Sequence, residues 1–240
     1  MAPDHQSNQQ AAAPRPVPTY LKWRRTLLAA CIILAPLSLT LYVVSWTENL
    51  RQPLVASATA GATGNALHFI GGVAASFFLP LGYLGMSLLG MRRAPGLATI
   101  AAALSLVGWI PWSALIAADD LAYDINRIGS TPQLAALWAY FNGDAVMSAY
   151  LLIYVIGHLL SAIVIGFMLG RLRLIPMWAA WAFALSSPLN VLYFPIHNLA
   201  VQNALKYLIC LFLLVGAAPA ALAMLRGSDD RGTDRTRSAS

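Results

Sequence analysis

The chain has 240 residues, of which 59% are hydrophobic and only 10% charged, and its mean hydropathy is +0.66. Several apolar runs reach about 20 residues, the length that a helix needs to cross roughly 30 Å of hydrocarbon, so the sequence predicts a polytopic membrane protein. The formal net charge of +6 does not indicate nucleic-acid binding, because no basic groove or stacking aromatic platform accompanies it.

The apolar runs predict an all-α bundle of six transmembrane helices in one membrane domain, residues 21–226. The tail 1–20 is rich in Gln, Ala and Pro and lacks an apolar period, so we expect it to be disordered, and we expect the same of 227–240. The six predicted spans, in chain order, are 27–46, 66–90, 97–117, 145–169, 177–196 and 202–225.

Charged residues separate between the two sets of connections. Twelve of the fifteen basic residues flank the first and last spans or lie in the short turns 91–96 and 171–176. Because Lys and Arg near span ends are retained in the cytoplasm, this pattern predicts a multi-pass protein of the cell membrane with both termini cytoplasmic. The acids outside the tails all lie in the other connections: Glu48, Asp119, Asp120, Asp124 and Asp144.

Two predicted hairpins, 66–117 and 145–196, resemble each other. Each has a basic turn that ends in proline, and each continues into an Ala-Leu-Ser segment. The match indicates a parallel repeat of two hairpins, or it reflects shared membrane composition. Prolines inside spans, among them Pro80, Pro111 and Pro188, either kink the helices and open a cavity between the hairpins or are ordinary for membrane helices.

Histidines at membrane depth are candidate functional residues. His158 lies near the middle of the fourth span, one turn after Tyr154, and either makes a structural polar contact or handles a proton or ligand. His68 lies about one turn into the second span, and His197 ends the fifth. A haem held by His68 and His158 is not expected, because the two lie at different depths, and the sequence predicts no cofactor and no metal site.

An Asp-Asp-x-x-x-Asp cluster, Asp119, Asp120 and Asp124, follows the third predicted span. If the helix continues, Asp120 and Asp124 share a face and repel each other, and the helix dipole there disfavours anions. Both effects favour a protonated carboxylic acid near neutral pH. The alternative is a solvated acidic loop. Diphosphate chemistry with Mg²⁺ is not expected, since a second aspartate-rich segment is missing.

Aromatic side chains gather toward the same face. Interfacial belts explain most of them, but Trp109 and Trp112 bracket Pro111 within the third span, close to the acids. Together with Tyr154 they predict an apolar pocket in which aromatic faces would stabilise a carbocation. Asn190 and His197 are the polar residues expected to contact a substrate there.

Residues 68–89, the Arg92-Arg93 turn and the Arg-x-Arg-x-x-Pro-x-Trp segment 171–178 resemble a family of uncharacterised actinobacterial six-span membrane proteins. The resemblance covers about 160 residues and implies a membrane-embedded bundle. Some bacterial membrane proteins of this size are terpene cyclases, but no diagnostic motif of theirs occurs here, so that analogy transfers no catalytic residue.

These observations favour a membrane enzyme that acts on a lipophilic, isoprenoid-type substrate by acid-initiated isomerisation or cyclisation in a cavity that faces the outer leaflet. The predicted proton donor is Asp120, with Asp119 and Asp124 adjusting its acidity and His68 or His158 relaying protons. The alternative is a non-enzymatic membrane protein: a small-molecule or lipid transporter, an immunity protein or an accessory subunit. The expected partners are the bilayer and a lipophilic small molecule.

Overall fold

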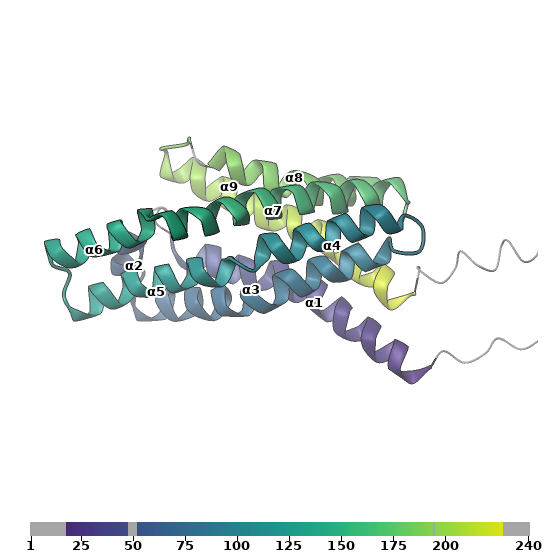
Figure 1. Cartoon of the computed structure of the whole chain (residues 1–240), viewed down its shortest axis with the longest axis horizontal. Helices are drawn as coiled ribbons and strands as arrows, with labels where there is room; N and C mark the ends of the chain where they lie inside the picture. Colours follow the sequence, from purple (N-terminus) through teal and green to yellow (C-terminus); the bar gives the residue numbers. More distant parts are fainter. Residues whose placement is uncertain (1–17, 48–51, 194, 228–240) are drawn as a thin grey trace, which may run out of the picture.

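In the computed structural model, residues 18–47, 52–193 and 195–227 are described, and their regular structure is entirely α-helical (Figure 1). The predicted all-α class is therefore confirmed. The expected disorder of the two tails concerns 1–17 and 228–240, which lie outside the described residues, as does Glu48. The helices are α1 (Thr19–Ser45), α2 (Pro53–Thr59), α3 (Gly61–Leu89), α4 (Pro95–Trp109), α5 (Trp112–Ile128), α6 (Pro132–Gly143), α7 (Ala145–Arg171), α8 (Met177–Tyr193) and α9 (Leu199–Leu225).

The described helices include five segments long and apolar enough to cross a membrane: α1, α3, the combined α4 and α5, α7 and α9. This is the character of a multi-pass membrane protein. α8 covers most of the predicted fifth span, but it is only 17 residues long. Pro111 separates α4 from α5, because proline cannot donate a backbone hydrogen bond and clashes with the preceding turn.

The predicted connection 118–144 is largely helical instead of a loop. Residues 112–128 contain no Gly or Pro to stop the helix, so α5 continues to Ile128 and ends at Gly129, whose φ of 97° is accessible mainly to glycine. α6 then begins at Pro132, with Thr131 as its N-cap. The acidic cluster therefore lies within a helix.

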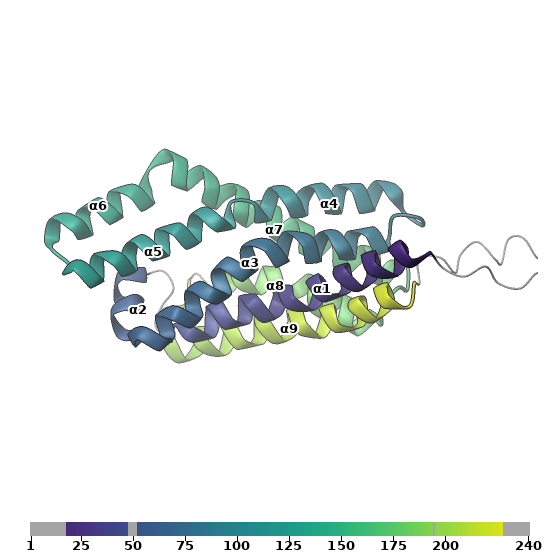
Figure 2. The ribbon, with the colours of Figure 1, turned by 90° about the horizontal axis from the view of Figure 1, so that it is seen from below.

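Six helices form a closed ring. α1 packs against α3, α3 against α4, α4 against α7, α7 against α8 and α8 against α9, and α9 closes the ring on α1 (Figures 1 and 2). α5 and α6 extend beyond this ring at one end, and no residue of α6 is buried. The ring arrangement leaves a central space into which side chains from opposite helices project.

The basic residues of the turns gather at the other end of the bundle. The α3–α4 turn, the α7–α8 turn, the start of α1 and the end of α9 all lie there (Figure 1). Arg93 in the first turn donates a hydrogen bond from Nη1 to the carbonyl of Leu172 in the second, at 3.1 Å. The two predicted hairpins, α3–α4 and α7–α8, thus point the same way, as a parallel repeat requires; their common origin stays a prediction.

Candidate functional site

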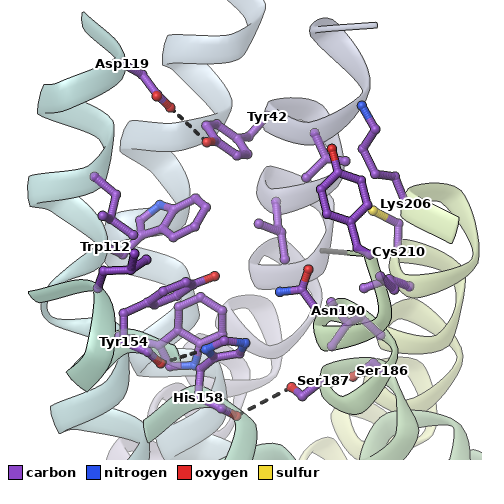
Figure 3. Close-up of a pocket in the computed structure, with 18 of the residues that line it drawn as sticks. Tyr42, Trp112, Asp119, Tyr154, His158, Ser186, Ser187, Asn190, Lys206 and Cys210 are labelled. Carbon is purple, nitrogen blue, oxygen red and sulfur yellow. Dashed lines mark hydrogen bonds between the residues drawn. The ribbon is translucent and has the colours of Figure 1, made fainter. Parts of the chain in front are cut away.

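A cavity of about 350 Å³ lies inside the ring (Figure 3). Its wall is mostly apolar, and each of the nine described helices, α1 to α9, contributes at least one lining residue. Figure 3 shows Asp119 and Tyr42 at one end, which we call the acid end, and His158 at the other, which we call the inner end. Trp112 and Tyr154 lie between the two ends. A volume of this size falls in the range of small-molecule sites.

The acid end is organised around the buried carboxyl group of Asp119. The Tyr42 hydroxyl donates a hydrogen bond to Asp119 Oδ2 at 2.8 Å, and His68 Nε2 lies 3.3 Å from the same oxygen. His68 is completely buried, and its Nδ1 lies 2.9 Å from the carbonyl oxygen of Tyr42. A carbonyl oxygen can only accept, so Nδ1 must be the protonated, donating nitrogen.

The tautomer of His68 has a chemical consequence. With Nδ1 protonated, the contact between Nε2 and Asp119 Oδ2 is a hydrogen bond only if a proton lies between them. That proton makes the pair either an imidazolium with a carboxylate or a neutral imidazole with a carboxylic acid. A proton shared by this pair would lie on the wall of the cavity.

Other side chains hold this pair in position. The indole of Trp46 stacks on the His68 imidazole, with ring centroids 3.5 Å apart and planes 1° from parallel. Trp46 Nε1 donates to Asn65 Oδ1 at 2.9 Å, and Asn65 Nδ2 donates to the carbonyl of Ser57 at 2.8 Å. Asn126 of α5 donates to Ser57 Oγ at 2.6 Å. Four helices are thus tied together behind the proton-bearing pair.

Lys206 brings a basic group to the same part of the cavity. It is buried, with 5% of its surface exposed, and its Nζ donates a hydrogen bond to the Trp46 carbonyl at 3.3 Å. This contact joins α9 to the residue that follows α1. Among the described cavity-lining residues, Lys206 is the only lysine or arginine.

An unbroken aromatic wall joins the two ends. Centroid spacings of 4.9, 5.5 and 4.3 Å lead from Tyr42 to Trp112, then to Tyr154 and then to His158. Trp109 packs edge-on against Trp112 and Tyr154. A ligand that reached from one end to the other would lie beside these rings.

The inner end is polar but incompletely paired. His158 Nδ1 lies 2.6 Å from the Tyr154 carbonyl, so this nitrogen carries the proton and Nε2 carries a lone pair. His158 Nε2 and Trp109 Nε1 are both buried, and neither has a hydrogen-bond partner among the described residues. Ser187 lies beside His158, donating to its carbonyl oxygen at 3.5 Å, and Asn190 points into the cavity (Figure 3).

Two glycines bring α4 and α7 together next to His158. A Cβ atom at Gly108 would lie 2.4 Å from the backbone of Gly157, and a Cβ at Gly157 would lie 2.4 Å from Cα of Gly108. Real side chains do not tolerate such distances, so both positions require glycine for the close approach. This contact sets Trp109 beside His158, with ring centroids 5.4 Å apart.

The structure separates the residues predicted from sequence into two groups. Asp119, Trp109, Trp112, Tyr154, His158 and Asn190 line the cavity, and His68 lies directly behind Asp119. Asp120 is exposed, Asp124 lies 3.5 Å from Arg127 on the exposed side of α5, and His197 is exposed in the connection before α9. Asp120 and Asp124 therefore lie on the exposed face of α5, and the acid that lines the cavity is Asp119.

Tyr42 is a functional candidate that the sequence analysis missed. It lies 77 positions before Asp119, inside a span with no acidic or basic neighbour within one turn, so no local pattern marks it. Ser186 was likewise noted only as part of the Ala-Leu-Ser segment, and Ser187 was not singled out. The signal that was available is weak: polar side chains in otherwise apolar spans face the interior of a bundle.

Comparisons with known proteins leave the site without a precedent: no family model, no curated protein and no solved structure matches this chain. Within the described residues, no group of three or more His, Cys, Asp or Glu side chains is placed to hold a metal ion. The cavity and its lining residues are therefore the structural features that bear on function.

Proposed function

We propose that the protein is an integral membrane enzyme that isomerises or cyclises a lipophilic, isoprenoid-type substrate, with Asp119 as the proton donor. The observation that carries the proposal is the position of the Asp119 carboxyl group, which contacts His68 Nε2 and the Tyr42 hydroxyl on the wall of an apolar cavity. Asp119 replaces Asp120, the donor predicted from sequence, because the Asp120 side chain is exposed to the outside of α5.

The proposed reaction begins with proton transfer from the Asp119 carboxyl group to an alkene carbon. A new C–H bond forms from the alkene π electrons, and the positive charge appears on the neighbouring carbon. The Asp119 carboxylate then takes a proton from an adjacent carbon, whose C–H electrons form the new double bond. Substrate and product are isomers, and the proton returns to the pair of Asp119 and His68.

The aromatic wall supports this chemistry because a carbocation is attracted to π faces. Cation–π contacts contribute about 2 kcal/mol or more each when the ring and the cation are both desolvated. Trp112 and Tyr154 lie along the path from the acid end and have buried rings. A cavity that excludes water also protects the cation from being trapped as an alcohol.

We further propose six membrane crossings, with α8 as the fifth, both termini in the cytoplasm and the acid end toward the outer leaflet. The support is the gathering of the basic turns at one end of the bundle and the apolar composition of α8. α6 has no charged residue and no buried one, as expected of a helix that rests against lipid.

The test compares two variants of adjacent acids, Asp119→Asn and Asp120→Asn, with the wild type. Cells with and without each form are extracted, and their lipids are compared by mass spectrometry coupled to chromatography, which separates isomers of equal mass. We expect the wild type and Asp120→Asn to produce the same altered isoprenoid and Asp119→Asn to lose at least 100-fold of that activity. Loss of activity in Asp120→Asn alone would return the role to Asp120, and unchanged lipids in every strain would favour the non-enzymatic alternative.

A further inference from the structure

The inner end of the cavity offers one unpaired acceptor and one unpaired donor. His158 Nε2 can only accept, because Nδ1 carries the ring proton, and Trp109 Nε1 can only donate. His158 and Trp109 are 4% and 2% exposed, so bulk water does not satisfy them. Leaving a buried polar group unpaired is unfavourable, and such groups in native structures commonly mark a place where something else binds.

The chemistry of the two orphan groups restricts the ligand. Both side chains line the cavity, and their ring centroids lie 5.4 Å apart. A hydroxyl group donates one hydrogen bond and accepts another, whereas a ketone or an ether only accepts and a hydrocarbon does neither. An anion such as a diphosphate would need cations, and the cavity's one lysine, Lys206, lies at the acid end.

We infer that the inner end is a binding site for the hydroxyl group of an uncharged lipophilic alcohol, whose O–H donates to His158 Nε2 and whose oxygen accepts from Trp109 Nε1. The inference deepens the proposed function and rests on it for the isoprenoid character of the ligand. The substrate is then an isoprenoid alcohol, lying along Trp112 and Tyr154 with its hydroxyl at the inner end and an alkene near Asp119. The remaining polar side chains at that end, Asn190 and Ser187, surround the hydroxyl with neutral groups.

The test measures binding of farnesol and of farnesyl methyl ether to the purified protein in nanodiscs, using native mass spectrometry to determine Kd. The ether keeps the acceptor oxygen and loses only the donor. In the wild type we expect farnesol to bind about ten-fold more tightly than the ether, the effect of one buried hydrogen bond. Equal affinities would overturn the inference and would mean that only a water molecule pairs with the two groups.

Three variants resolve the two hydrogen bonds. His158→Phe should abolish the preference for the alcohol while leaving the affinity of the ether unchanged. Trp109→Phe should weaken both ligands by a similar factor and keep the preference, since both ligands have an acceptor oxygen. Trp181→Phe, a matched change at an exposed site on α8, should alter neither. A preference that survives in His158→Phe would exclude His158 as the acceptor.

Binding and turnover can fail separately. The same Kd values measured on Asp119→Asn should show the same preference for farnesol, because the substitution lies at the acid end. If lipids are unchanged by Asp119→Asn but farnesol is still preferred, the proposed reaction fails and the hydroxyl site stands. If Asp119 is needed for turnover but alcohol and ether bind equally, the reaction stands and the hydroxyl site fails.

Discussion

The two ends of the cavity contain the same motif in different states. At each end a buried histidine stacks on an aromatic ring, Trp46 for His68 and Tyr154 for His158, and each Nδ1 donates to a backbone carbonyl. The ends differ in what faces Nε2. For His68 it is the Asp119 carboxyl group, whereas for His158 no described residue serves as partner. Both ring nitrogens of His68 thus have a partner, whereas among the described residues His158 has a partner at Nδ1 alone.

The largest expected effect comes from the contact that holds the inner end together. Gly108→Ala places a methyl group against the backbone of Gly157, which cannot move aside as a side chain would. We expect a loss of about 3 kcal/mol in the free energy of unfolding, measured by denaturant titration in mixed micelles. The matched control is Gly96→Ala on the same helix, where nothing lies within 4 Å of the new methyl group. An equal loss in both variants would refute the close packing of α4 and α7.

Replacing the paired histidine should also destabilise the protein. His68→Phe removes one of the two contacts of Asp119 Oδ2 and one donor to the Tyr42 carbonyl, which keep the Tyr42 hydroxyl and Ser45 Oγ as their remaining partners. We expect the free energy of unfolding to fall by about 2 kcal/mol. The measurement is the same titration, and a variant as stable as the wild type would show that the pair carries no structural role.

The same substitution at the inner end should act in the opposite direction. His158→Phe removes a buried acceptor that has no partner in the described structure and keeps the stacking on Tyr154. The substitution also removes the Nδ1 hydrogen bond to the Tyr154 carbonyl, which offsets part of the gain. We therefore expect the ligand-free protein to gain about 1 kcal/mol in stability. Saturating farnesol should reverse the order, since only the wild type forms the additional hydrogen bond. Destabilisation of the ligand-free variant would argue that His158 is already satisfied.

The smallest effect is expected outside the cavity. Asp124 and Arg127 form a 3.5 Å ion pair in which both side chains are more than half exposed. Solvent screens such pairs, so Asp124→Asn should change the free energy of unfolding by less than about 0.5 kcal/mol. A loss as large as that of His68→Phe would indicate that Asp124 contributes to the acid end after all.

Hydropathy was sufficient to predict the long helices, but it could not predict which of the adjacent aspartates faces the cavity. Long apolar runs must be helical in a membrane, so α1, α3, α7 and α9 follow directly from composition. Asp119 and Asp120 are neighbours in sequence, but successive helical residues point about 100° apart, and which one faces inward depends on how α5 packs on its neighbours. The aromatic residues were easier to predict because Trp109, Trp112 and Tyr154 lie in spans at helical spacing.

The hydrogen-bond partners of Asp119 could not be predicted from the sequence for a different reason. Tyr42 and His68 come from α1 and α3, and only the packing of three helices brings them to α5. For the residues after 117, the sequence left a continued helix and a solvated acidic loop both open, and the absence of Gly and Pro between 112 and 128 agrees with the helix. The pairing of distant helices, in contrast, has no signature within a short window of sequence.

The closure of the ring by α1 and α9 has a consequence for how the protein is made. The first and last of the described helices are mutual neighbours, and α9 contributes Lys206, Cys210 and Leu213 to the cavity wall. With the six membrane crossings proposed above, one side of the first helix stays unpartnered until α9 is inserted. The insertion of α9 then completes the cavity, and a chain that stops before α9 lacks the part of the cavity wall formed by Lys206, Cys210 and Leu213.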